Sequence, residues 1–256
     1  MKIPRLALLN SKLPFVARGI GALKSPKLAD ISPNNFENWQ MYVLCTQVLF
    51  GDKKEIIFLG KGIGDNNDYD TLTDYKIEIT SKFNLITSSV DLREALCEAF
   101  TLFFCNKIVF HSETNSFWVF DVSKETPIHV GIINNENYLV VEDVLKQLLH
   151  CESEYEDDEE NYEDEVSKEL WERAKKYRNQ SNQSANSDTY AMDNIISKLS
   201  TCGIGYTVEN IYELTVYQLY DQFSSYTQNR ISQLSENAYA HNGGENFNAM
   251  AWLENK

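Results

Sequence analysis

A glycine-rich stretch at residues 60–65, GKGIGD, is the first place where this sequence could do chemistry, by binding a phosphate. Phosphate-binding loops surround the anion with backbone N–H groups and the N-terminus of a helix. The stretch lacks the glycine spacing of a Walker loop and of a dinucleotide fingerprint. It also ends in Asp65 and is followed by Asp68, which puts negative charge where phosphate would lie. We expect a glycine-rich turn followed by a solvated loop.

The histidines show no spacing typical of a metal or catalytic site. His111, His129, His150 and His241 form neither H-x-x-x-H nor H-E-x-x-H, and no G-x-S-x-G motif is present. We therefore expect no catalytic residue, no cofactor and no metal, and a protein that is not an enzyme. If a site were assembled from scattered residues instead, the candidates would be Asp65, Asp68 and His111.

Cysteine usage points to a reducing compartment. The five cysteines are odd in number and include no C-x-x-C pair, which argues against a disulfide framework and a thiolate zinc site. Cys45, Cys97 and Cys105 lie in apolar runs, so we expect inert buried thiols there. No window approaches 18 consecutive apolar residues, so neither a membrane-spanning helix nor a secretory segment is expected. An intracellular protein is the expectation.

The first 33 residues are basic and proline-rich. Residues 1–29 contain no acidic residue, and four of the five prolines lie in residues 1–33. Because proline fixes φ and pushes the preceding residue out of the helical region, we expect residues 1–33 to form an extended arm. Its cations are candidates for binding a partner: Lys2, Arg5, Lys12, Arg18, Lys24 and Lys27.

A second, opposite charge concentration follows near the middle of the chain. Ten carboxylates and no base occur in residues 152–165, whereas the whole 256-residue chain has a formal net charge of −15. The favoured interpretation is a solvated linker, which is what blocks of like charge usually are. The alternative is an anionic decoy or inhibitor that binds a basic nucleic-acid-handling protein. Its central residues are Glu156, Asp157, Asp158, Glu159 and Glu160. A third interpretation, that the segment binds a hard cation, has less support than these two, because no glycine is present to make the turn that calcium sites need.

The patterns between these charged segments predict an α+β domain at residues 34–150. Residues 36–50 are apolar enough for a buried helix, although a strand is also compatible, and 55–59 and 73–80 read as strands. A helix is expected over 88–104, where apolar residues recur at steps of three and four. Next we expect a hairpin (107–111 and 117–121) and a third strand (127–133). A closing helix should start near Asn134 or Asn135.

The last third of the chain predicts a small helical domain at residues 188–256, after an acidic linker, a charged helix and a polar loop at 151–187. Apolar residues recur at helical spacing in DTYAMDNIISKLSTCG and in LTVYQLYDQFSSYTQ. Gly203 suits the left-handed conformation that often ends a helix. The tail breaks at Gly243-Gly244 and ends in three apolar anchors that must pack on something. These anchors, Met250, Trp252 and Leu253, either pack on their own chain or bind a neighbouring subunit.

Several of these segments together resemble proteins of the tail modules of tailed bacteriophages. The resemblance rests on GIINNENYLVVEDVLKQL, ELWERAKKYR, IYELTVYQLYDQF and the terminal Trp-Leu, in that order, over roughly residues 90–256. They look like tail assembly chaperones and baseplate-associated proteins, and the basic arm favours a structural subunit. No individual catalytic or binding residue carries over from the resemblance.

The resemblance implies a non-enzymatic structural or assembly protein that works through multivalent contacts with other tail or baseplate proteins. The expected partners are such viral proteins, in an oligomer or a larger complex, without sequence-specific nucleic-acid binding or a membrane. The expected location is the host cytoplasm during assembly, with the virion as a second place. The arm and the C-terminal anchors would engage the neighbours.

Overall fold

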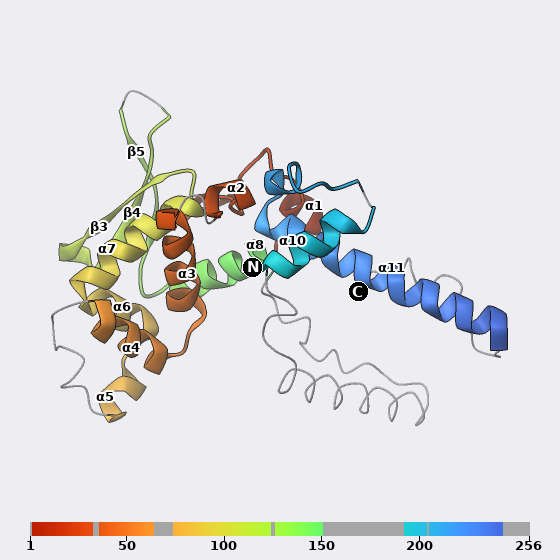
Figure 1. Cartoon of the computed structure of the whole chain (residues 1–256). Coiled ribbons are helices and arrows are strands. Elements are labelled where there is room, and N and C mark those ends of the chain that lie inside the picture. The colour runs from red at the N-terminus through yellow and green to blue at the C-terminus, as the bar shows by residue number, and fades with distance from the viewer. Residues whose placement is uncertain are drawn as a thin grey trace. The chain divides into compact units, whose positions relative to one another are not determined.

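The protein was analysed as a computed structural model that describes residues 2–32, 36–63, 74–123, 126–150, 192–203 and 205–242 (Figure 1). It combines helices with two small antiparallel sheets, which confirms the expected α+β class. The chain forms two compact units, one of Met1–Cys151 with Tyr212–Tyr217 and the other of Glu152–Ile211 with Gln218–Lys256. The segment Tyr212–Tyr217 therefore returns to the first unit.

The N-terminal segment is folded, where the sequence predicted an extended arm. It forms α1 (Arg5–Leu8), a hairpin of β1 (Phe15–Ala17) and β2 (Gly21–Leu23), and α2 (Leu28–Ile31). Leu23, Leu28 and Ile31 are almost fully buried. Pro4 is the N-cap residue of α1, and Pro14 and Pro26 lie just before β1 and α2, so these prolines precede regular elements and do not prevent them. Burial of the apolar residues between them offsets the entropy cost of ordering the segment.

Two predicted strands are helices instead. Residues 55–59 belong to α4 (Lys53–Ile63), and residues 74–79 form the short helix α5 (Asp74–Ile79). In α4, the buried residues Ile56, Ile57 and Gly60 lie on one helical face. The expected glycine turn is also wrong for residues 60–63, which lie inside α4, while Asp65 and Asp68 lie outside the described residues.

Two helices of the first unit agree with the prediction, α3 (Phe36–Phe50) and α7 (Val90–Ala99), which continues into the 3₁₀ turn η2 (Phe100–Leu102). Helix α6 (Lys82–Ser88), which precedes α7, was not predicted. Ser89 caps α7 by accepting a hydrogen bond from the backbone N–H of Leu92 at 3.2 Å. Leu92, Leu96 and Phe100 are buried, as the spacing predicted.

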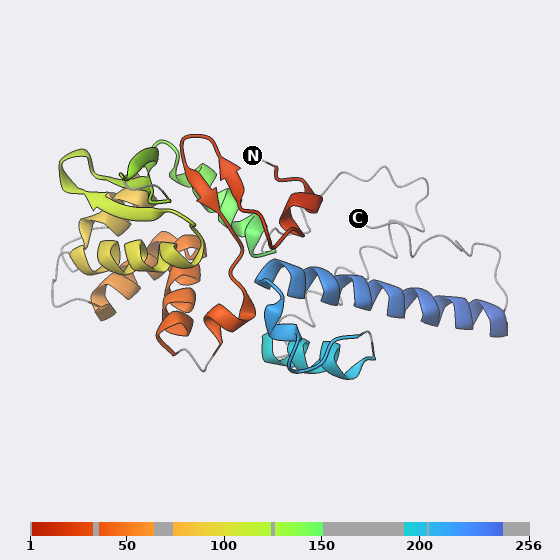
Figure 2. The ribbon, with the colours of Figure 1, turned by 90° about the horizontal axis from the view of Figure 1, so that it is seen from above.

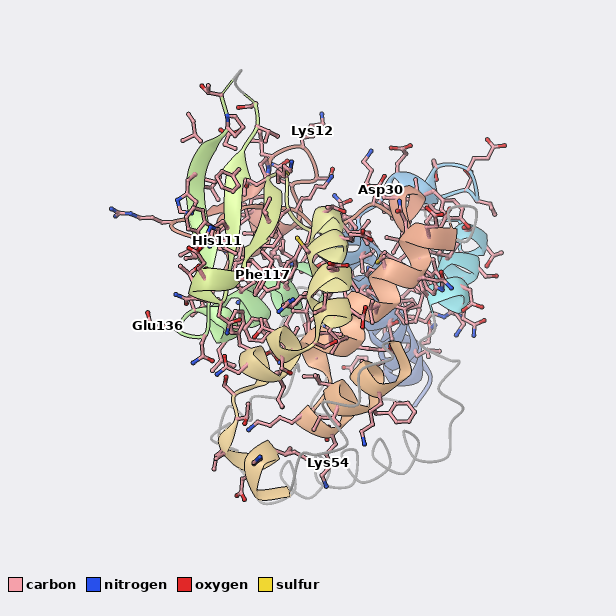
Figure 3. All side chains as sticks on the ribbon, turned by 90° about the vertical axis from the view of Figure 1, so that its left-hand side faces the viewer. Lys12, Asp30, Lys54, His111, Phe117 and Glu136 are labelled. Atoms are coloured by element: carbon pink, nitrogen blue, oxygen red, sulfur yellow. The ribbon has the colours of Figure 1, made fainter. Side chains whose placement is uncertain are left out.

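The predicted three-strand meander is confirmed. β3 (Lys107–His111), β4 (Ser116–Asp121) and β5 (Ile128–Ile133) form an antiparallel sheet in the order β3-β4-β5. The connection from β3 to β4 contains the 3₁₀ turn η3 (Ser112–Thr114) and Asn115 in the left-handed region. Figure 3 shows the strands as a layer beside α7 and α3. The sheet therefore has one face on the helical core.

Helix α8 (Tyr138–Leu148) closes this core. Its buried residues include Tyr138, Val141, Leu145 and Leu148, which recur at steps of three and four on one helical face. Aromatic rings join the helix to the sheet, since Phe83 lies 5.4 Å from Tyr138 and 6.2 Å from Phe117 between ring centroids. The core of the first unit therefore lies between α3, α6, α7, α8 and one face of the sheet.

The returning segment pairs with the N-terminal region of the same unit. It includes the last two residues of the 3₁₀ turn η5 (Ile211–Glu213) and the first two residues of α11 (Val216–Asn242). The backbone N–H of Leu28 donates to the carbonyl of Leu214, and that of Val216 donates to the carbonyl of Pro26, both at 2.9 Å. These backbone bonds fix residues 26–28 from both sides.

The described part of the second unit is helical. It contains α10 (Met192–Thr201) and the larger part of α11, and Gly203 has a φ of +71°, as expected for the end of α10. Helix α11 continues to Asn242, further than the predicted stripe. Ile195 and Leu199 of α10 and Leu219 of α11 are fully buried.

Candidate interaction surfaces

The N-terminal segment is anchored to the first unit by backbone contacts. The N–H of Ile3, a buried residue, donates to Gln147 Oε1 of α8 at 2.6 Å. The N–H of Ala22 donates to Asn106 Oδ1 at 2.7 Å, and the N–H of Lys24 donates to the carbonyl of Phe103 at 2.7 Å. Figure 2 shows this N-terminal segment, with α1 and the β1–β2 hairpin, in red at the start of the chain. Residues 3–24 are therefore held in place without a partner molecule.

The cations predicted to bind a partner remain on the outside of this anchored segment. Five are exposed: Lys2, Arg5, Lys12, Arg18 and Lys24. Lys27 is the exception, because its Nζ donates to Glu213 Oε2 at 2.7 Å in an ion pair. This hydrogen bond and the charge of its partner raise the pKa of Lys27 and lower the pKa of Glu213. Whether the other cations bind a partner stays a prediction.

Large apolar side chains are exposed along the same segment. Leu6, Leu13 and Val16 are 82%, 69% and 71% exposed. Single exposed apolar residues are ordinary on protein surfaces, but three of them among five cations within 24 residues make this segment a candidate interaction site. We call this the N-terminal surface, made of Lys2, Arg5, Leu6, Lys12, Leu13, Val16, Arg18 and Lys24.

A second candidate surface is the side of the β3-β4-β5 sheet that points away from the core. Along β4, Phe117 and Val119 are fully buried, whereas Trp118 and Phe120 are half-buried. The register places Val109 opposite Trp118 and His129 opposite Phe120. We call the outward residues the sheet face: Lys107, Val109, His111, Trp118, Phe120, His129, Val130 and Ile132.

A bulge in β5 shifts the register between β4 and β5 by one residue. Val119 is opposite Gly131, but Phe120 is opposite His129, so that Val130 is an extra residue. A Cβ on Gly131 would lie 2.5 Å from the carbonyl oxygen of Ile20, which explains glycine at this inward position. The bulge therefore lets β5 contact the N-terminal hairpin on one side and present His129 on the other.

The rings of the sheet face stack on one another. The His111 and Trp118 rings are nearly parallel with centroids 4.4 Å apart, and the His129 ring is 5.0 Å from that of Trp118. Trp118 Nε1 also donates to Ser116 Oγ at 3.2 Å. The Nδ1 atom of His111 is buried without a hydrogen-bond partner. His111, an enzyme candidate from the sequence, therefore belongs to an aromatic cluster on a surface.

A charged cluster centred on the buried Glu142 lies in the first unit. Glu142 Oε1 accepts from Lys82 Nζ at 3.3 Å and from Lys146 Nζ at 2.8 Å, and Lys82 Nζ also donates to the carbonyl of Leu49. Burial lowers the pKa of Lys82, against the opposing effect of Glu142. Burial likewise raises the pKa of Tyr138, whose hydroxyl is buried without a hydrogen-bond partner. The cluster ties α8 to α6 and to the end of α3.

Several predicted site residues lie outside the described residues. These are the acidic segment with Glu156, Asp157, Asp158, Glu159 and Glu160, the anchors Met250, Trp252 and Leu253, and Asp65 and Asp68. Their roles stay predictions. Across the described ranges, no group of three or more His, Cys, Asp or Glu side chains is arranged to hold a metal ion. None of the helices in these ranges has the length and hydropathy needed to cross a membrane.

The cysteine prediction is right for one residue and wrong for another. Cys45 is fully buried, and burial raises the pKa of its thiol. Cys97 is half-buried, and its thiol donates to the carbonyl of Ile108 at 3.2 Å. Cys105 is exposed, because it lies where the backbone leaves the core to pair with β2.

Sequence reasoning did not single out the sheet face, although its signal was present. Successive side chains of a strand point to opposite faces of the sheet. In the predicted strands FWVFD and KIVFH, every second side chain therefore had to point away from the core. The residues that were missed in this way are Val109, Trp118, Phe120, His129 and Val130. The internal cluster also had a signal in the spacing of Glu142 and Lys146, which are four residues apart on one helix.

Comparison with known families gives one match, in the last third of the chain. Residues 180–256 match the family described as the YomV second domain, which is phage-derived, from a Bacillus prophage. The matched range covers less than a third of the chain and contains α10 and α11. No curated protein and no solved structure matches the chain. The C-terminal part of the chain is thus similar to a phage-associated domain, in line with the bacteriophage resemblance.

Proposed function

We propose that this chain is a non-enzymatic structural or assembly protein of a phage tail or baseplate, which acts through several protein–protein contacts. The similarity of residues 180–256 to a phage-derived domain supports a viral protein. The family's description, a second domain, also agrees with a chain in which another folded unit precedes the matched range. The tail or baseplate assignment extends the resemblance seen in the sequence.

The observation that carries this proposal is the N-terminal surface. Its backbone is fixed to the first unit through Ile3, Ala22 and Lys24, yet Leu6, Leu13 and Val16 remain in solvent. A partner that covers these side chains gains the apolar burial without the entropy cost of ordering a loose arm. The surrounding cations select an acidic partner surface and speed the encounter.

The proposal places the protein in the host cytoplasm during assembly and in complexes with other tail or baseplate proteins. Its test is sedimentation of particles and tail intermediates from cells in which the encoding phage replicates. We expect the wild-type chain in the tail or baseplate fraction. The double variant Leu6→Asp/Leu13→Asp should lose about tenfold or more of this association, because it puts carboxylates into an apolar contact.

A matched control separates a specific surface from general stickiness. Phe58→Asp changes a side chain of α4 that is 77% exposed and should leave the association unchanged. Circular dichroism melts of both variants should match the wild type. Absence of the expressed wild-type chain from every particle and intermediate would refute the proposal. Equal losses in the double variant and in Phe58→Asp would refute the role of the N-terminal surface.

A further inference from the structure

We propose that the sheet face is the interface through which two copies of this chain associate, with the two sheets packed face to face. The proposal is independent of the proposed function, because it uses other residues and its partner is a second copy of the chain. It rests on four features of the sheet face: exposed aliphatic side chains, the arrangement of the rings, the absence of carboxylates and the covering of the opposite side.

Aliphatic side chains of the sheet face are open to solvent on two different strands. Val109 of β3 is 40% exposed and Val130 of β5 is 37% exposed, on either side of Trp118 in β4. The inward residues of the same strands, Phe117 and Val119, are fully buried. Apolar side chains that continue across three strands on a solvent-facing side are typical of a docking surface.

The ring arrangement favours a protein partner over a nucleic acid. Proteins that bind single-stranded nucleic acid stack the bases on free faces of aromatic rings. Here His111 stacks on Trp118 from β3, and His129 contacts Trp118 from β5. Phe120 in turn has the His129 ring at 5.6 Å. Because neighbouring rings already cover these faces, the sheet face offers ring edges and aliphatic groups, which pack well against another sheet.

The charges favour a second copy in particular. The chain has a net charge of −15, so two copies that met through an acidic surface would bring carboxylates together. None of the side chains of the sheet face is a carboxylate, and its one ammonium, Lys107, lies at the start of β3. Two copies can therefore meet through this surface without contacts between like-charged acidic groups.

The opposite side of the sheet is already covered. Its inward residues contact the N-terminal hairpin, since a Cβ on Gly131 would meet Ile20 and a Cβ on Gly21 would meet Val119. Rings of α6 and η2 pack on Phe117 from the same side. A second sheet can therefore reach only the sheet face. Two identical sheets packed about 10 Å apart around a twofold axis form a closed dimer.

Sedimentation velocity of the full chain over a concentration series, on the order of 1–500 μM, tests this inference. We expect a reversible dimer whose dissociation constant rises about tenfold or more in Val109→Asp and, separately, in Val130→Asp. The two variants change different strands, so a folding defect in one leaves the other as a test. Circular dichroism melts identify such a defect.

Two controls decide the outcome. Leu139→Asp changes a side chain of α8 that is 69% exposed and should leave the dimer unchanged. Leu6→Asp/Leu13→Asp should also leave it unchanged, which separates this interface from the N-terminal surface. A wild-type chain that stays monomeric at the highest concentration overturns the inference. A dimer that is insensitive to both valine variants, or equally sensitive to Leu139→Asp, overturns it as well.

Discussion

The two sides of the β3-β4-β5 sheet carry similar residues that differ in burial. Phe117 and Phe120 lie three residues apart on β4, yet Phe117 is fully buried and Phe120 is half-buried. Around Phe117, the rings of Phe83, Phe100 and Phe110 lie at 6.2, 5.7 and 5.1 Å between centroids. Around Phe120, the neighbours are Trp118 and His129 on the same open side.

This difference teaches that residue type alone does not separate a folding role from a binding role. Both phenylalanines contribute apolar area, but only the covered one gains the full free energy of burial when the chain folds. The open one can gain the remainder when a partner arrives. Measurements of folding and of association should therefore respond to different residues of one strand.

The largest expected effect on stability comes from Phe117. Phe117→Ala should lower the free energy of unfolding by about 3–5 kcal/mol, because it removes a fully buried ring and leaves a cavity among three others. Phe120→Ala should cost about 1 kcal/mol or less, because its ring is partly in solvent already. Urea denaturation of both variants measures the difference. Equal losses would show that the outward side is as well packed as the core.

A smaller effect is expected where the sheet meets the N-terminal hairpin. Gly131→Ala places a Cβ 2.5 Å from the carbonyl oxygen of Ile20, so the hairpin or β5 must shift. Overpacking of this kind costs about 1–3 kcal/mol. Val130→Ala, at the adjacent outward residue, is the control and should unfold nearly like the wild type. Hydrogen exchange of the Ile132 amide, which donates to the carbonyl of Gly19, reports the shift directly.

The same contrast between covered and open groups applies to the ion pairs, with the smallest effect. Burial holds the pKa of Lys82 below its usual 10.5 in the folded protein, although Glu142 and Glu55 oppose this and Lys146 adds to it. Between the two pKa values the unfolded chain binds more protons, so the stability contributed through Lys82 rises with pH up to about 10.5. Lys82→Met should lack this rise.

The exposed pair provides the control for Lys82. Lys27 has a raised pKa in the folded protein, so its contribution is present below its ordinary pKa and is lost as pH rises through the higher, folded value. Lys27→Met should thus change the pH dependence in the opposite sense to Lys82→Met. Denaturant titrations of both variants from pH 7 to about pH 11 compare the signs. The same sign for both would contradict the assignment of burial as the dominant cause at Lys82.

Much of the first unit could be predicted from residue patterns. The helix at α7, the meander and the buried side of α8 follow from steps of three to four and from alternation. The run EIIFL was too short to distinguish helix from strand. A helix signal was nevertheless present, because Asp52 and Glu55 form a reciprocal cap: Asp52 Oδ1 accepts from the N–H of Glu55, and Glu55 Oε2 accepts from the N–H of Asp52, both at 2.8 Å.

The alternation at residues 73–80 failed for a different reason. Helix α5 is only six residues long, and a pattern of that length fits both periods. Its last carbonyls, those of Ile77 and Glu78, accept hydrogen bonds from Lys53 Nζ of α4. A side chain more than 20 residues away in the sequence thus stabilises the helix end, and no local pattern could reveal it.

The amino-acid sequence by itself determined the α+β class, the alternation that gives the sheet two different sides and the cations of the N-terminal segment. These follow from local periodicity and composition, which act over a few residues. Only the tertiary structure decided that the segment is anchored and that one sheet side stays open. Burial depends on which distant elements pack against a residue. The hydrogen bonds from Ile3 to Gln147 and from Leu28 to Leu214 join such distant parts of the chain.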